Sequence, residues 1–188
     1  EKTEYNIYNY IRKNSFTSSK NLDTEIKKAI ELLPINARNL LKDTKFYIAN
    51  DNSYYDRKKD EIYLLKDADK YEILHEIGHT IETKLDILHD EKYIQIQRSG
   101  IDIQQMNIGN IEGYDKKYEF WLNDNKFISE YQRMVYEYDI DKKERLNFLD
   151  YTFNTKTLGE YFSEGFRCCF ENNKLLKRKD IDLLKMAQ

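Results

Sequence analysis

The pentapeptide His-Glu-Ile-Gly-His at residues 75–79 constrains this 188-residue chain more than any other feature of its sequence. In an α-helix, histidines four residues apart lie one turn apart on the same face, where both imidazoles can reach one metal ion. The chain has 3 histidines, and a random sequence of this composition contains His-Glu-x-x-His with a probability of roughly 0.4%. Glu76 points about 100° away from His75 around the helix, so it can lie beside such an ion without binding it. The motif therefore predicts a metal-binding helix.

The residues around this motif predict a buried amphipathic helix from about Asp69 to His89. Apolar side chains recur at three- and four-residue steps, and the charged residues between them, including Glu72 and Glu82, are expected to face solvent. Gly78 costs about 1 kcal/mol relative to alanine in a helix, so a closely packed neighbour is expected there. The alternative is a core helix whose histidines are satisfied by neighbouring side chains. Burial of two imidazoles and a carboxylate is costly without such partners or a metal, and this cost favours the metal site.

Length and composition favour a single domain and argue against several classes of protein. A chain of 188 residues can bury a core and form a cleft. Its net charge of -3 and pI of about 5.8 argue against nucleic-acid binding, and no apolar run is long enough to span a membrane. No signal peptide is visible in the chain, so its location is left open. Cys168 and Cys169 are adjacent, which indicates packing residues and not a disulfide framework.

The order of the predicted elements places the motif helix after a small sheet. A first helix is expected to begin at Asp23 or Thr24 and to end before Pro34. Residues 44–50 and 60–66 predict two strands separated by a polar turn, and the motif helix follows at once. Because the second strand leads directly into that helix, we expect it to have a free edge at the cleft, where an extended peptide can pair.

The second half of the chain is expected to be mostly helical. Helices are predicted at residues 118–138, 157–172 and 180–188. The whole pattern predicts an α+β fold that is mostly helical and forms a single domain over residues 1–188. Within it we expect a sheet-containing lobe at about 1–90 and a helical lobe at about 91–188.

A catalytic metal site requires a third protein ligand beside the two histidines. His89 is unsuitable, because on a continuous helix it lies about 15 Å beyond His79. The segment "LGEYFSEGF" at residues 158–166 supplies the strongest candidates. Glu160 and Glu164 are one helical turn apart on one face, and the aromatic residues beside them can pack in a core. Their spacing does not distinguish which acid binds the metal, and a solvated helix face is the alternative.

The two motifs together resemble those of the peptidases similar to anthrax lethal factor, which include the secreted Pro-Pro endopeptidases of clostridia. The family signature E-[FY]-F-x-E-x-F matches "EYFSEGF" at residues 160–166, and the resemblance covers most of the chain. It implies a zincin-like fold with a small mixed sheet, an HExxH active-site helix and a C-terminal helical lobe. It also implies zinc, bound by His75, His79 and Glu160, and a secreted or delivered effector such as a toxin domain.

Carried over residue by residue, the resemblance makes Glu76 the acid that activates water and Glu164 a carboxylate that orients a histidine. The family also has a tyrosine seven residues before its third ligand, where this chain has Phe153. Tyr151 is the nearest phenol in sequence that could replace it as a donor to the oxyanion.

The sequence therefore predicts a monomeric zinc-dependent endopeptidase that acts on a protein or peptide substrate. No nucleic-acid partner and no membrane span are expected. Two alternatives stay open. One is a catalytically weakened lethal-factor-like domain that acts as a protein-binding module, which Phe153 favours. The other is a structural domain that carries the motif by chance.

Overall fold

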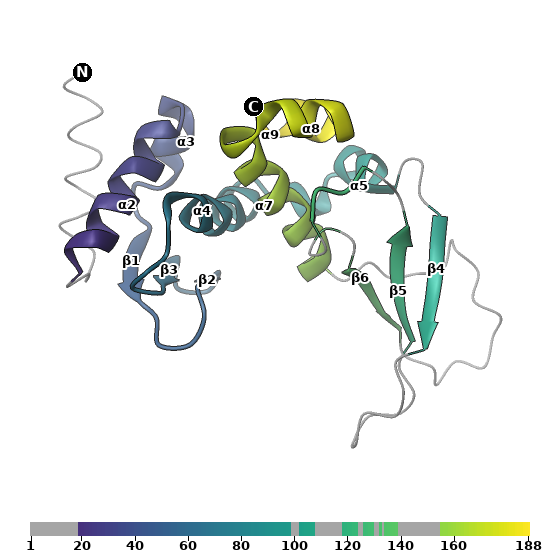
Figure 1. Cartoon of the computed structure of the whole chain (residues 1–188), viewed down its shortest axis with the longest axis horizontal. Coiled ribbons are helices and arrows are strands. Elements are labelled where there is room, and N and C mark those ends of the chain that lie inside the picture. Colours follow the sequence, from purple (N-terminus) through teal and green to yellow (C-terminus); the bar gives the residue numbers. More distant parts are fainter. Residues whose placement is uncertain are drawn as a thin grey trace.

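The computed structural model gives the chain an α+β fold that is mostly helical (Figure 1). It describes residues 19–98, 102–107, 118–123, 126–129, 132, 134–138 and 155–188. The described strands form two separate three-stranded sheets. In Figure 1 two helices, α4 (Lys70–Lys84) and α7 (Thr155–Glu171), lie between these sheets. The predicted fold class is confirmed at this level.

The first sheet contains one strand that the sequence did not predict. Strands β1 (Lys45–Ile48) and β3 (Glu61–Leu64) were expected, and they pair in parallel. Strand β2 (Tyr54–Asp56) lies in the segment expected to be a polar turn, and it pairs antiparallel with β3. Ring stacking explains this pairing: Tyr54 stacks on Tyr63 of β3 with ring centroids 4.7 Å apart, and cross-strand aromatic pairs stabilise a sheet.

The strand order β1-β3-β2 corrects the expected location of the free edge. The strand at residues 60–66 was expected to have an unpaired edge at the cleft, but β3 is the central strand and pairs on both sides. The short strand β2 is the edge strand on the side of α4, with which it is in contact. A central position suits β3, because Ile62 and Leu64 are fully buried against the core.

The first described helix, α2 (Lys20–Leu32), begins earlier than the sequence predicted. Its cap is Ser19, whose hydroxyl accepts a hydrogen bond from the backbone N–H of Leu22 at 3.3 Å. A serine at this position satisfies the first turn as well as Asp23 or Thr24 could, so the helix gains an extra turn at its start. Its end before Pro34 is as predicted, and a short helix, α3 (Ile35–Leu40), follows.

The motif helix α4 begins as predicted and ends five residues earlier than predicted. Asp69 caps it, with side-chain oxygen distances of 2.9 and 2.8 Å to the backbone nitrogens of Tyr71 and Glu72. The helix ends at Lys84, because Asp86 adopts a left-handed conformation with φ 53° and a short 3-10 helix, η1 (Ile87–His89), follows. His89 is exposed and pairs with Asp86. It lies away from the other two histidines because the helix ends before it, whereas a continuous helix was expected from the sequence.

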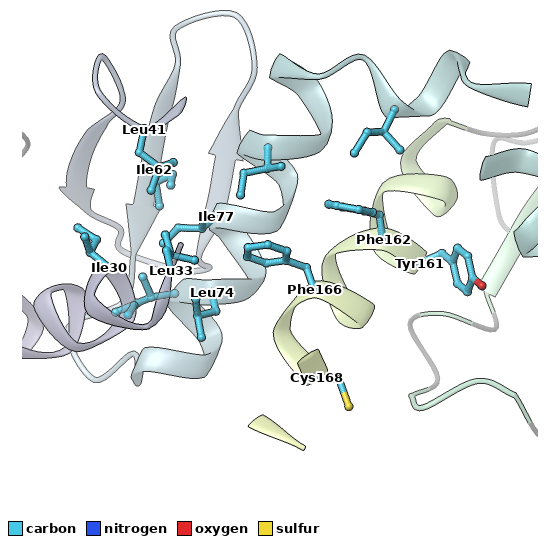
Figure 2. Close-up of a cluster of buried hydrophobic side chains, with 14 of the residues drawn as sticks. Ile30, Leu33, Leu41, Ile62, Leu74, Ile77, Tyr161, Phe162, Phe166 and Cys168 are labelled. Atoms are coloured by element: carbon cyan, nitrogen blue, oxygen red, sulfur yellow. The ribbon is translucent and has the colours of Figure 1, made fainter. Parts of the chain in front are cut away.

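Helix α7 lies directly against α4 and carries the second motif. Phe162 and Phe166 of α7 point toward α4, where Leu74 and Ile77 belong to the same buried cluster (Figure 2). Gly78 allows α7 to approach α4 closely, as the glycine inside the helix predicted. A Cβ atom added at Gly78 would lie 2.9 Å from the Cα of Ser163 on α7. The two sequence motifs therefore face each other across a tight helix pair.

Two further helices, α8 (Asn173–Lys179) and α9 (Ile181–Ala187), pack against α7. The predicted closing helix is thus confirmed. Leu176 of α8 is fully buried. Helix α5 (Glu91–Arg98), which comes between η1 and β4 in the chain, also contacts α9. None of the helices in the described part of the chain is both long and apolar enough to cross a membrane.

The helix predicted at residues 118–138 is wrong. This region contains strands β5 (Tyr118–Asn123) and β6 (Met134–Tyr138), which form an antiparallel sheet with β4 (Asp102–Asn107) in the order β4-β5-β6. The segments YEFWLN and MVYEY are rich in aromatic residues, which favour strands when a neighbouring strand is present. The lobe expected to be helical therefore also contains a sheet.

Candidate metal centre

Two helices bring together three side chains that could hold a metal ion. His75 and His79 come from α4, and Glu160 comes from α7. The Nε2 atom of His75 lies 3.1 Å from Oε2 of Glu160, and the Nε2 atom of His79 lies 3.2 Å from Oε1 of the same carboxylate. The ligand atoms of all three residues lie within 4.8 Å of one another. Of the two acids that the spacing left open, Glu160 is the one that meets both histidines through its carboxylate.

The chemistry of these three groups fits a metal ion. Oε2 of Glu160 is buried, and the group nearest to it is Nε2 of His75, at 3.1 Å. The two imidazole rings are nearly perpendicular, with centroids 4.9 Å apart, and both present Nε2 to the carboxylate. Nitrogen and oxygen atoms that converge in this way can hold a divalent cation.

The ionisation of Glu160 and that of His79 are linked. Burial raises the pKa of Glu160, but hydrogen bonding with His75 and His79 outweighs it and brings the pKa to about 2. Burial lowers the pKa of His79, but Glu160 and Glu82 outweigh it and bring the pKa to about 9. Without a metal ion, a proton on His79 thus supplies the positive charge that this cluster of carboxylates requires.

Glu76 lies on α4 between the two histidines in sequence. Its side chain is buried on α4 and lines the cleft. Burial raises its pKa, and the nearby histidines only partly offset this effect. A carboxylate with a raised pKa next to a metal site can accept and return a proton near neutral pH.

Glu164 lies behind His75, one helical turn from Glu160. Its Oε1 atom is 3.7 Å from Nδ1 of His75, the ring nitrogen opposite the one that faces Glu160. Its Oε2 atom accepts a hydrogen bond from Nε of Arg167 at 2.7 Å and lies 2.7 Å from Nη2 of the same guanidinium in an ion pair. This position agrees with the orienting role that the resemblance implies, and that role stays a prediction.

Glu82 was expected to face solvent, and this was wrong. Its side chain is fully buried, its Oε1 atom lies 3.8 Å from Nδ1 of His79, and the same oxygen accepts a hydrogen bond from Arg57. The three-residue spacing from His79 was a signal that Glu82 lies near the site. Arg57 gave no comparable signal, because it belongs to the turn between β2 and β3.

A cleft of about 830 Å³ opens over these residues. The edge strand contributes Tyr54 and Tyr55, and the start of α4 contributes Tyr71 and Glu72. The far end of α7 contributes Glu171. The candidate metal centre is therefore reachable from outside, and the cleft passes along β2 and the first turns of α4.

Tyr151, the predicted oxyanion donor, and Phe153 lie outside the described residues. The placement of these two side chains relative to the metal-binding group stays a prediction. The described part of the site therefore consists of the three convergent ligands, Glu76, and a glutamate behind each histidine.

Comparison with known proteins adds no relative. No protein-family model, no curated protein and no solved structure matches this chain. The resemblance to lethal-factor-like peptidases thus rests on the two sequence motifs, and the chemistry of the site rests on its own geometry.

Proposed function

We propose that this chain is a zinc-dependent endopeptidase that hydrolyses a peptide bond of a protein substrate. One observation carries the proposal: two imidazole Nε2 atoms and the Glu160 carboxylate converge at a cleft. Glu76 is buried directly beside them. Two helices that only pack together do not require two imidazoles and two carboxylates at one cleft. Metal-assisted hydrolysis uses all four groups, three to hold the metal and one to transfer protons.

The donor set supports zinc as the metal. Catalytic zinc sites commonly have three protein ligands, such as two histidines and a glutamate, and keep a further position for water. Zinc–ligand bonds of about 2.0 to 2.1 Å place the atoms of a tetrahedral site roughly 3.3 Å apart. The separations of 3.1 and 3.2 Å between Nε2 and the Glu160 oxygens are close to that spacing.

Glu76 supplies the proton chemistry in this proposal. Zinc, when bound, lowers the pKa of a water molecule and polarises the carbonyl of the scissile bond. Glu76 takes the proton from the water and returns it to the departing amine. Its raised pKa suits both steps, because a carboxylate with a higher proton affinity is a stronger base.

The substrate is proposed to lie along β2. This strand has the free edge that was expected for β3, and its residues Tyr54 and Tyr55 line the cleft. Among the described strands, none pairs with the outer edge of β2. An extended peptide can add to such an edge through backbone hydrogen bonds, which accounts for a protein substrate and not a small molecule.

A catalytically weakened protein-binding module is the second candidate function. It is favoured by Phe153, which cannot donate a hydrogen bond where the resembling family has a tyrosine. Loss of one oxyanion donor typically costs about 10²- to 10³-fold in turnover. Such a domain would bind zinc and a peptide and cleave slowly or not at all.

The first experiment combines zinc analysis with digestion of a peptide library. The parent protein is expected to contain one zinc ion and to cleave. Glu76→Gln should keep zinc and lose about 10²- to 10⁴-fold in turnover, because the general base is absent. Retained cleavage by Glu76→Gln would refute the assignment, and zinc without cleavage by the parent would favour the weakened module.

A histidine pair provides the matched control for this experiment. His75→Ala should lose zinc, whereas His89→Ala should keep zinc and activity, because His89 is exposed and pairs with Asp86 away from the site. If the parent protein binds no zinc, the proposal that the His-Glu-Ile-Gly-His motif binds zinc is wrong.

A further inference from the structure

We infer that Glu82 and Arg57 form a positioning pair that orients His79 for metal binding. The inference rests on the proposed metal site and extends it by two residues. Glu82 Oε1 lies 3.8 Å from Nδ1 of His79 and accepts a hydrogen bond from Arg57. The carboxylate thus stands on the side of the imidazole away from Glu160, with the guanidinium behind it.

The burial of Glu82 is difficult to explain without such a role. Its side chain has no exposed surface, and its Oε2 atom has no hydrogen-bond partner among the described residues. Thr83 contributes a weak contact to Oε1 at 3.4 Å. Burying a carboxylate is costly unless it is paired. The groups that compensate it are Arg57 and the imidazole of His79.

A rigid turn delivers Arg57 to this position. The backbone N–H groups of Lys58 and Lys59 donate to Oδ1 of Asp56 at 2.9 and 3.2 Å. At the end of the turn, Asp60 has a φ of 54° and forms an ion pair with Lys84 of α4 at 2.9 Å. The turn is therefore fixed on both sides of Arg57 and is tied to the helix that carries the histidines.

The tyrosine and threonine hydroxyls next to this turn add to its rigidity. Oδ1 of Asp60 accepts hydrogen bonds from Tyr55 at 3.0 Å and from Thr44 at 2.8 Å. Lys84 also donates to the hydroxyl of Thr44 at 2.9 Å. Arg57 thus reaches Glu82 from a preorganised segment, which is how a positioning residue limits the motion of the group it supports.

Gly159 provides independent steric support. A Cβ atom at this position would lie 3.1 Å from Nη2 of Arg57, 3.3 Å from Oε1 of Glu82 and 3.4 Å from Nδ1 of His79. A side chain at the residue before Glu160 would therefore meet all three members of the proposed group. Any larger residue would press on this group, so the glycine keeps the space in which Glu82 meets the imidazole.

The arrangement repeats the one behind the other histidine. His75 is backed by Glu164, which Arg167 holds, and His79 is backed by Glu82, which Arg57 holds. A carboxylate near Nδ1 favours the tautomer with a proton on Nδ1, and this leaves the Nε2 lone pair for a metal ion. Both Nε2 atoms face Glu160, the side on which the metal ion would lie.

The test is zinc affinity, measured by competition with a chromogenic chelator. Glu82→Leu removes both the charge and the acceptor and should weaken zinc binding about 10- to 100-fold. Glu82→Gln keeps an acceptor for Nδ1–H and should lose less. The matched control is Glu72→Leu, which removes a glutamate of the same helix that also lines the cleft but bonds to Ser53. The zinc affinity of Glu72→Leu should fall by no more than about twofold.

A spectroscopic readout separates positioning from a purely structural role. Nitrogen NMR of the zinc-loaded parent should show His79 protonated at Nδ1 and bound through Nε2. In Glu82→Leu this signal should broaden or change tautomer. If Glu82→Leu does not fold, Arg57→Met serves in its place, because the Arg57 side chain is 40% exposed and its removal should weaken zinc binding several-fold.

The outcomes of this test distinguish the inference from the proposed function. A parent protein without measurable zinc affinity would contradict the metal site itself. A parent that binds zinc, with Glu82→Leu and Arg57→Met both no weaker than Glu72→Leu, would overturn the positioning pair and leave the metal site in place. A graded loss from Glu82→Gln to Glu82→Leu would support it.

Discussion

At the scale of single residues, the glutamates of the site have different pKa values and different proposed roles because their surroundings differ. Burial raises the pKa of Glu76, whereas the two histidines outweigh the effect of burial at Glu160 and lower its pKa to about 2. The carboxylate with the raised pKa is suited to carry protons, and the one with the lowered pKa is suited to remain a charged ligand. Glu164 lies between an imidazole and an arginine, which suits orientation and not proton transfer.

The ligand assignment predicts an order of effects for two alanine variants. Glu160→Ala should lower zinc affinity at least about tenfold, because it removes a ligand that faces both histidines. Glu164→Ala should lower it less, because that side chain acts through His75. A chelator competition titration measures both. If Glu164→Ala has the larger effect, the wrong acid of the pair has been chosen as the ligand.

At the scale of elements, the contact between α4 and α7 holds the candidate site together. Two ligands come from one helix and one from the other, so the distance between the helix axes determines whether all three can meet. The close approach at Gly78 and Ser163 sets that distance. A metal ion bound across this contact would link the two helices.

Gly78→Ala tests this contact. Alanine favours a helix by about 1 kcal/mol over glycine, but its Cβ would lie 2.9 Å from the backbone of Ser163, which cannot rotate away. We expect a net loss of about 1 to 3 kcal/mol in unfolding free energy, measured by urea denaturation in the presence of a chelator, and weaker zinc binding.

Gly165→Ala is the matched control for this substitution. Its Cβ would clash with Cδ2 of Leu183, a buried residue of α9. Gly165 lies on the same helix as Ser163, so Gly165→Ala also strains the fold, but at the contact with α9 and not at the contact with α4. It should affect zinc affinity less than Gly78→Ala does. Unchanged stability and zinc affinity in Gly78→Ala would show that the helices can separate without consequence for the site.

At the scale of the whole molecule, the metal-free site makes stability depend on pH. The pKa of His79 is raised in the folded state to about 9 from an ordinary value of 6.5. A raised folded pKa means that protonation stabilises the fold. This stabilisation is complete below about pH 6.5 and is lost as the pH rises through about 9, with a magnitude of at most about 3 kcal/mol.

Urea denaturation with a chelator between pH 6 and pH 9.5 measures this dependence. The unfolding free energy of the metal-free parent should fall over that range. His79→Asn removes the titrating group and should give a flatter profile. Equal slopes for the parent and the variant would contradict the assignment of the raised pKa to His79.

The sequence by itself determined the two motif helices and which of their residues share a face. Local periodicity and capping fix these properties, because a helix places residues four apart on one side whatever surrounds it. The faces of His75 and His79 on α4, and of Glu160 and Glu164 on α7, were predicted for this reason. The close neighbour at Gly78 was also predicted, because a glycine inside a helix lowers helix stability and is expected where a larger residue would not fit.

Only the tertiary structure decided which segments meet. Residues 118–123 and 134–138 form strands because neighbouring strands complete their hydrogen bonds, and β2 forms because β3 lies beside it. Glu82 is buried because Arg57, 25 residues earlier, reaches it from a turn. Such pairings join residues that are distant in the chain, and their stability comes from contacts that no local pattern contains.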